Sequence, residues 1–507
     1  MNRLNINLLD LPDEILLLIL KKLNNIDVLY SLIDVNNDHL NSLAQEKTYS
    51  HTLNFASIDN DSVIDQEKLD RFCKIILPKI HENVKYFILE PLSMECILLT
   101  ADYPNLTELK LFNFTEEICL KYFTNESSLR YIFQEKLTHL TLINSDERPK
   151  IESLRTYNEN VYEHILKFFR NLKHLSFIDA HHRSHPSLLL CDSPSISFFS
   201  ANLTYLSINV YTFDDFLYLL DGRFKQLTIL IVRISRKTKL PSVISITDNL
   251  SNLKCFSLIC YRRLDIYDEH ILPLLHHMTC LEKFTIYLCI SKRDKFIDNS
   301  HLENEILRYM PHLHSFIFYI STYYDRADDL FHYVPRHDIQ QITVNIKHQQ
   351  YMVNMINYIN INQAVYSIFS LPFTFQRIRD VGNKFPDIIF KYVTHLVVQD
   401  IVLFNHEFFL RVSRSFPLLH RLSVINPILQ SSSDMNSFLF NDSQSCSIAK
   451  YPHLTTLSVA GEANINNIEE FLNETKTSVP CLISLRATYN DLKSVTKNFT
   501  REETRNN

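Results

Sequence analysis

Glycine is nearly absent from this 507-residue chain. Only Gly222, Gly382 and Gly461 occur, whereas a chain of average composition would contain roughly 35 glycines. Loops that cradle phosphate groups and turns that present a nucleophile need glycine, because its backbone reaches positive φ and approaches a ligand closely. No two of the three glycines lie within the length of one such motif. The sequence therefore argues against a nucleotide-binding enzyme.

The chain also lacks a long apolar run and a strong net charge. No stretch approaches the ~18 apolar residues of a membrane helix, and Asp10, Asp13 and Glu14 interrupt the N-terminal region where a signal peptide would be apolar. The formal net charge of −6 is small for this length, which argues against an extended surface for nucleic acid. We expect no nucleic-acid partner, no membrane association, and a cytoplasmic and/or nuclear location.

Motifs for metal binding and catalysis are missing as well. The ten cysteines include no Cys-x-x-Cys pair, and several, such as Cys255 and Cys289, lie in apolar runs, so we expect reduced thiols. His181, His182 and His185 cluster in a polar stretch that is typical of a solvated loop. Since 22 histidines guarantee accidental combinations, no catalytic set can be singled out. We expect no metal, no cofactor and no catalytic residues.

What the chain does contain is a recurring phrase, apolar-x-x-apolar-x-apolar. Clear copies include YPNLTELKL at 103, FRNLKHLSF at 169, SANLTYLSI at 200 and YPHLTTLSV at 451. Weaker copies begin at Val84, Ile339, Val365 and Val393. The copies return about every 28 residues, which is the spacing of long leucine-rich repeats, in which a helix follows each strand.

One strand-plus-helix unit of this length cannot bury its own apolar side, whereas stacked units share a continuous core. We therefore expect an α/β fold: a curved leucine-rich-repeat solenoid over residues 47–490, with parallel strands inside and helices outside. Residues 491–507 are expected to form a polar tail. The asparagine that usually follows the strand motif is mostly missing, with Asn113 and Asn144 as candidates.

Amphipathic segments between the phrases support this reading. Four of them are typical of short helices: Asp214–Leu220, Glu303–Tyr309, Glu407–Val412 and Ile468–Leu472. In the strands, Leu106, Leu109, Leu111 and their equivalents should point into the core.

The residues that flank the middle leucine of each strand should face the open, concave side of the solenoid. The candidates for binding a substrate there are Glu108, Lys110, His139, His174, Tyr205, Lys283 and Arg421. The second flanking residue is usually Ser or Thr. Such a hydroxyl-lined face could recognise a protein or peptide, although Ser and Thr are also tolerated on an open sheet face that binds nothing.

Residues 8–46 do not carry the repeat and predict a three-helix module. Pro12 suits the first turn of a helix, and the two acidic residues after it complement the helix dipole, which predicts a helix over residues 12–23. Asp27 can cap a second helix, and a third segment is expected near Asp38–Glu46. A module of about 40 residues has little interior, so part of the apolar first helix should meet another protein or the end of the solenoid.

The pattern Leu11-Pro12-x-Glu14-Ile15-x-x-x-Ile19-Leu20-x-x-Leu23, followed by Asp27-x-Leu29 and Leu32, resembles the F-box. The whole chain resembles the F-box/leucine-rich-repeat proteins. This resemblance implies a non-catalytic substrate receptor of an SCF-type cullin–RING ubiquitin ligase, which links an unknown substrate protein to ubiquitin-dependent degradation.

Carried onto this chain, the resemblance implies that nine residues contact the adaptor subunit of the ligase or form the core of the module. They are Leu8, Leu11, Pro12, Ile15, Leu16, Ile19, Leu20, Leu29 and Leu32. The third segment departs from the family, because Asn36-Asn37-Asp38-His39 replaces the basic and aromatic stretch of many F-boxes. The alternative is a leucine-rich-repeat scaffold without a ubiquitin-ligase link, whose first helix only caps the solenoid.

Overall fold

The structure is a computed structural model that describes residues 11–56, 65–146, 151–179, 186–191, 199–236, 252–325, 342–345, 350–360, 362–426, 447–460 and 465–501. The chain divides into two compact units, Met1–Ser257 and Leu258–Asn507. Both units combine helices with mostly parallel strands, which confirms the α/β class. No described helix is both long enough and apolar enough to cross a membrane.

Short helices open the first unit: α1 (Asp13–Leu20), α2 (Asn25–Leu32), α3 (Asp38–Ala44) and α4 (Lys47–Ser50). The helix predicted over residues 12–23 is therefore too long. Asn24 already has an extended backbone and caps α2, where its side chain accepts a hydrogen bond of 3.2 Å from the N–H of Ile26, so α1 must end earlier. The prediction that Asp27 caps this helix is wrong, and Asp27 pairs instead with Lys68 at 2.7 Å.

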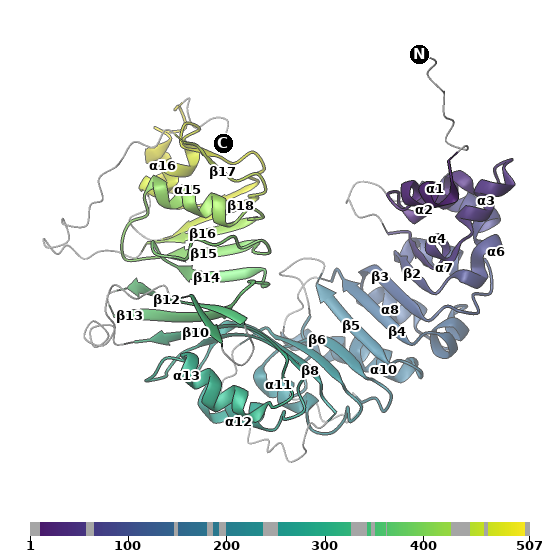
Figure 1. Ribbon diagram of the computed structural model, residues 1–507, viewed down its shortest axis with the longest axis horizontal. Helices are drawn as coiled ribbons and strands as arrows, with labels where there is room; N and C mark the ends of the chain where they lie inside the picture. The colour runs from purple at the N-terminus through teal and green to yellow at the C-terminus, as the bar shows by residue number, and fades with distance from the viewer. Residues whose placement is uncertain are drawn as a thin grey trace, which may run out of the picture. The chain divides into compact units, whose positions relative to one another are not determined.

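The first unit then builds a parallel sheet in chain order (Figure 1). Its strands are β1 (Thr52–Asn54), β2 (Tyr86–Leu89), β3 (Glu108–Phe114), β4 (His139–Asn144), β5 (His174–Asp179), β6 (Tyr205–Val210) and β7 (Ile229–Ile234). Each strand pairs in parallel with the next one along the chain.

Helical segments connect most of these strands. They include α5 (Gln66–Arg71), η2 (Phe72–Ile76), α6 (Leu77–Ile80), α7 (Pro91–Leu99), α8 (Glu116–Tyr122), η4 (Ile132–Lys136), α9 (Ile151–Tyr157), η5 (Asn158–Glu163), α10 (His164–Phe168) and α11 (Phe213–Leu219). The helix predicted at 214–220 is thus confirmed. Parallel strands need such a crossover connection, because the chain must return to the end of the sheet where the previous strand began before the next strand can start.

The leucines of the repeated phrase occupy equivalent positions in this sheet. Leu109, Leu140, Leu175, Leu206 and Leu230 are direct register partners on consecutive strands, and all are buried. The prediction that the phrase marks strands with inward leucines is confirmed for these copies. The residues between the leucines lie on the opposite face, because side chains alternate along a strand.

An asparagine ladder precedes the strands instead of following them. The side-chain amides of Asn105, Asn202 and Asn252 donate to the main-chain carbonyls of Glu82, Arg170 and Lys225, at 2.7, 3.1 and 2.9 Å. The amide of Asn171 donates likewise to the carbonyls of Gln134 and Glu135, at 3.1 and 3.2 Å. These bonds join neighbouring turns, which explains why an Asn-Leu pair so often opens the phrase.

The second unit begins with parallel strands and then changes direction. β8 (Cys255–Leu264), most of which belongs to this unit, neighbours β9 (Lys283–Ile290), and β9 pairs in parallel with β10 (Ser315–Tyr324). Between and after these strands lie η6 (Tyr267–Ile271), α12 (Leu272–His276), α13 (Asn299–His301), η7 (Leu302–Ile306) and η8 (Leu307–Tyr309). The helix predicted at 303–309 is thus a π-helical turn followed by a 3₁₀ turn.

Two predicted parallel repeats are wrong. The weaker copies of the phrase at Ile339 and Val365 correspond to antiparallel strands, although Ile339 itself lies outside the described residues. β13 (Gln363–Ser370) lies antiparallel to both β10 and β12 (Gln350–Asn360), and β11 (Ile342–Asn345) lies antiparallel to β12. Only residues 361 and 362 separate β12 from β13, and so short a connection can only reverse the chain.

Parallel pairing resumes in a separate sheet of the second unit. Its strands are β14 (Arg377–Val381), β15 (His395–Gln399), β16 (Arg421–Ile425), β18 (Thr456–Ala460) and β20 (Ser484–Arg486). The accompanying elements are α15 (His406–Ser415), α16 (Ile465–Leu472), α17 (Tyr489–Val495) and the short pair β17 (Ala449–Lys450) and β19 (Thr477–Ser478). The helices predicted at 407–412 and 468–472 are confirmed inside α15 and α16.

Candidate functional site

The residues predicted to contact an adaptor divide between the interior and the surface of the N-terminal helices. Leu16 and Leu29 are buried and belong to the interior. The remaining described members are half-buried or exposed: Leu11, Pro12, Ile15, Ile19, Leu20 and Leu32. Leu8 lies outside the described residues. The hydroxyl of Tyr49 on α4 donates to the carbonyl of Leu17 at 3.2 Å and so connects α1 to α4.

One side of α1 is an exposed apolar surface, which we name the α1 patch. It consists of Ile15, Leu18 and Ile19, with Leu23 just beyond the helix, and these side chains are 42, 58, 40 and 53% exposed. Residues three and four apart share one side of a helix, so the first three form a continuous surface, while Leu16 points inward. The sequence-based candidates omitted Leu18, although its apolar character on a mostly apolar helix was the available signal.

Aromatic and charged contacts attach this helical module to the segment that follows it. The ring of Tyr30 on α2 stacks on that of Phe72 at 6.1 Å, and the guanidinium of Arg71 lies 4.5 Å from the Tyr30 ring centre. Lys79 pairs with Asp34 at 2.5 Å, and this hydrogen bond lowers the pKa of the Asp34 carboxyl. These contacts involve α2 and Asp34, which follows it, and they leave the α1 patch uncovered.

The second candidate surface is the open face of the sheet in the first unit. Glu108, His139, His174 and Tyr205 are consecutive register partners on β3 to β6, so the structure brings four predicted residues into one row. The imidazoles of His139 and His174 lie 5.3 Å apart, and the ring of His174 stacks on that of Tyr205 at 3.7 Å and 7°. We name these four residues the ring row.

The His174 side chain of the ring row is uncharged at neutral pH. Burial in the stack, reinforced by the neighbouring charge of His139, lowers the pKa of His174 to about 4. The carboxylate of Glu108 is paired with Lys85 at 3.3 Å. The row therefore offers stacked rings to a partner, with a carboxylate–ammonium pair at the Glu108 end.

A second row runs beside the first. Lys110, Thr141, Ser176 and Ser207 are register partners on the same four strands. The ammonium of Lys110 lies 4.9 Å from the ring centre of Phe112, and Ser176 is buried. Of the predicted hydroxyl groups in this row, Thr141 and Ser207 are thus the more accessible.

The remaining predicted residues of the open face lie in the second unit and in different sheets. Lys283 is exposed at the start of β9, where its register partner is Ser315. Arg421 is half-buried on β16, between His395 and Thr456. The structure does not bring Lys283 and Arg421 into one row.

Part of the same face of β8 to β10 is covered. Tyr287 and Tyr319 point to the side on which Lys283 lies, yet both are fully buried. Their rings stack at 4.4 Å, and the ring of Phe375 meets that of Tyr287 at 5.2 Å. The hydrophobic cluster of the second unit contains these tyrosines together with core residues of β14, β15 and β16. Other side chains therefore cover this face of the sheet along the C-terminal halves of β9 and β10.

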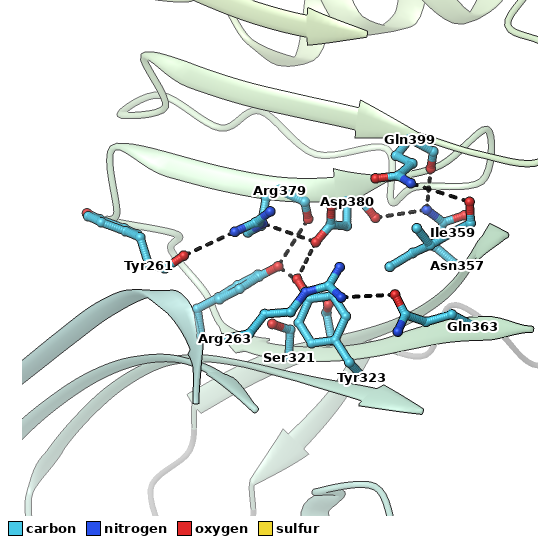
Figure 2. A network of polar contacts seen from close by, with 12 residues as sticks. Tyr261, Arg263, Ser321, Tyr323, Asn357, Ile359, Gln363, Arg379, Asp380 and Gln399 are labelled. Carbon is cyan, nitrogen blue, oxygen red and sulfur yellow. Dashed lines mark hydrogen bonds and ion pairs between the residues drawn. The ribbon is translucent and has the colours of Figure 1, made fainter. Parts of the chain in front are cut away.

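A buried polar network joins β10 and β12 of the larger sheet to β14 and β15 of the five-stranded sheet (Figure 2). Asp380 is 1% exposed, accepts a hydrogen bond from the hydroxyl of Tyr323, and pairs with Arg379 at 3.1 Å. The guanidinium of Arg379 also donates to the carbonyl of Tyr261 at 3.1 Å, and that of Arg263 lies 3.7 Å from the Tyr323 ring centre. Because the carboxylate is buried against its partner cation, the network serves to hold the sheets together.

The network continues through Asn357 on β12. Its amide donates to the carbonyls of Asp380 and Gln399, at 2.9 and 2.5 Å, and so joins β12 to β14 and β15. The side-chain amide of Gln399 donates in turn to the carbonyl of Ile359 at 3.4 Å. Nothing in the sequence pattern indicated these residues.

Within the described residues, no group of three or more His, Cys, Asp and Glu side chains could hold a metal ion. The predicted solvated loop with His181, His182 and His185 lies outside those residues. A cavity of about 270 Å³ is lined by Asp298, Met352 and Tyr366 among others, which is below the usual volume of a small-molecule site.

Comparison with known proteins adds no relative: no protein-family model matches the chain, and no curated protein matches it.

Proposed function

We propose that this protein is a non-catalytic substrate receptor of an SCF-type cullin–RING ubiquitin ligase. In this proposal residues 8–46 form an F-box that binds the adaptor subunit, and residues 47–490 form a leucine-rich-repeat solenoid that binds the substrate. The observation that carries the proposal is the α1 patch, because three large apolar side chains remain exposed on a helix of only eight residues and Leu23 adds a fourth just beyond it. Such a surface on a folded protein usually marks a contact with another protein.

The sheet of the first unit supports the solenoid. Register-matched leucines and the asparagine ladder repeat the same contacts from one strand to the next. In a solenoid each repeat contacts only its neighbours, and the strand face opposite the core is left open for a partner. The ring row lies on that face and is the proposed site for the substrate.

The test is capture of the purified adaptor subunit by the full chain, compared with the double variant Ile15→Asp/Ile19→Asp. Burying these two side chains contributes on the order of 1–2 kcal/mol each, so the double variant should bind at least tenfold more weakly. The matched control is Leu92→Asp on α7, where the side chain is 85% exposed, and it should bind like the parent chain. Failure of the parent chain to capture the adaptor would refute the proposal.

A repeat scaffold without a ubiquitin-ligase link is favoured by one observation. The stacking of Tyr30 on Phe72, and of Phe72 on Phe55 at 5.1 Å, is what a helical cap on the first strands would provide. Under this alternative, the double variant at Ile15 and Ile19 has no adaptor binding to lose. The same experiment therefore separates the two functions.

A further inference from the structure

Two cysteines from different helical segments of the first unit lie in direct contact. Cys73 belongs to η2 and Cys96 to α7, and their Sγ atoms are 2.9 Å apart. A disulfide requires a separation of about 2.0 Å, so modest side-chain rotations would bring the two sulfur atoms within bonding distance. Both thiols are free in the structure.

We propose that Cys73 and Cys96 form a reversible oxidation site that takes a hydroperoxide as its oxidant and closes to an intramolecular disulfide. The proposal concerns a modification of the first unit and does not depend on the proposed ligase function. It also differs from the expectation of reduced thiols, because that expectation rested on the lack of a Cys-x-x-Cys pair and on cysteines in apolar runs, whereas Cys73 and Cys96 are distant in sequence and meet only in the fold.

The surroundings assign a role to each sulfur. Cys96 is exposed on α7 and is accessible to an oxidant, whereas Cys73 is half-buried behind it. Burial, together with the hydrogen bond to Cys96, raises the pKa of the Cys73 thiol to about 12, so Cys73 stays protonated while Cys96 reacts. Cys96 is therefore the residue that is oxidised first, and Cys73 is the resolving residue.

The chemistry balances in two steps. The Cys96 sulfur attacks one oxygen of hydrogen peroxide, the O–O bond breaks, and a sulfenic acid and one water form. The Cys73 sulfur then attacks the Cys96 sulfur, the S–O bond breaks, and the departing hydroxide takes the Cys73 proton to form a second water. Two thiols are oxidised by two electrons and one peroxide is reduced to two waters.

A disulfide between Cys73 and Cys96 would constrain the segment that contacts the N-terminal helices. η2 contains Phe72, which stacks on Tyr30, and the preceding Arg71 donates to the carbonyl of Ile33 at 3.1 Å. A bond from Cys73 to α7 closes a loop over residues 74–95 and restricts the unfolded chain. We expect the first unit to unfold at a temperature roughly 5 °C higher or more after oxidation.

The experiment exposes the reduced full-length chain to hydrogen peroxide, denatures it, alkylates the remaining thiols and measures the intact mass. The chain has ten cysteines, so the expected result is two fewer alkyl groups, a single cross-linked peptide pair containing Cys73 and Cys96, and full reversal by dithiothreitol. The matched control is Cys481→Ser, which removes an exposed thiol of the second unit and should leave the link unchanged.

Single variants test the assigned roles without removing a large side chain. In Cys73→Ser, Cys96 should accumulate as sulfenic and then sulfinic acid, and in Cys96→Ser, Cys73 should stay reduced. Circular dichroism of each variant checks that it is folded. The proposal is overturned if the parent chain keeps ten alkylated thiols under peroxide that oxidises free glutathione, if other cysteines form the link, or if Cys96 of the parent chain becomes sulfinic acid instead.

Discussion

Gly382 lies against Asn357 so closely that no larger residue fits at this position. A Cβ atom on Gly382 would overlap the side-chain oxygen of Asn357 and would lie 2.7 Å from a carboxylate oxygen of Asp400. Asn357 in turn bonds the carbonyls of Asp380 and Gln399. One of only three glycines in the chain therefore allows β12 to approach the second sheet of its unit.

Replacing this glycine should destabilise the second unit. We expect Gly382→Ala to lower the free energy of unfolding by about 2–3 kcal/mol, because neither neighbour can move without losing hydrogen bonds. Urea unfolding of the full chain measures the change. In the double variant with Asn357→Ala the two effects should be less than additive, since the overlap with the Asn357 side chain disappears, and strict additivity would contradict the proposed contact.

Removing the buried charge of Asp380 should cost more than removing an exposed one. Asp380→Asn leaves the guanidinium of Arg379 without its partner, and breaking a buried ion pair from one side costs about 3 kcal/mol. Asp387→Asn is the matched control, because Asp387 is exposed in the same unit. Equal unfolding midpoints for the two variants in urea would show that the network does not fasten the sheets.

Stability should depend on pH through His174. Its pKa in the folded chain is about 4, below the ordinary 6.5, so between these values the unfolded chain binds a proton that the folded chain does not. The stabilisation is complete above pH 6.5 and decreases as the pH falls toward 4. Because the ring is partly accessible to solvent, we expect a loss of only about 1 kcal/mol.

The variant His174→Phe keeps the stacked ring and removes the titration. Its free energy of unfolding should change less between pH 7 and pH 4.5 than that of the parent chain. His312→Phe, at an exposed histidine, is the control and should keep the parent's pH dependence. An identical pH profile for His174→Phe and the parent would count against a neutral His174.

The contribution of each asparagine of the ladder to the free energy of unfolding should be measurable separately. Asn171→Ala removes the donor to the carbonyls of Gln134 and Glu135 and should lower the free energy of unfolding by about 1 kcal/mol. Asn171→Asp has nearly the same shape but places a negative oxygen beside those carbonyls, so it should be the more destabilising variant. Chemical denaturation that ranks the two variants in the opposite order would exclude hydrogen bonding as the function of Asn171.

The candidate surfaces were only partly predictable. The ring row was predicted as four separate residues on an open face, and it follows directly from the alternation of side chains in register-matched strands. The α1 patch was predicted as an apolar helix, but which of its leucines are exposed depends on Tyr49 and the interior position of Leu16. That packing involves residues more than 25 positions away, which a local pattern does not contain.

Some strands also escaped prediction. β1, β12 and β14 carry no copy of the repeated phrase, and β11 and β13 were mistaken for parallel repeats because their apolar residues have similar spacing. The alternation of apolar residues is the same in parallel and antiparallel strands. The length of the connection between two strands distinguishes parallel from antiparallel pairing, because the two residues between β12 and β13 can only reverse the chain.

The amino-acid sequence by itself determined the α/β class, the positions of the repeated strands and the burial of their leucines, because these depend on periodic contacts between adjacent segments. Only the tertiary structure decided that Asp380 is buried, that Gly382 is confined by Asn357, and that Cys73 meets Cys96. Each of these contacts joins residues about 20 or more positions apart or depends on such a contact, and the spacing of leucines carries no information about them.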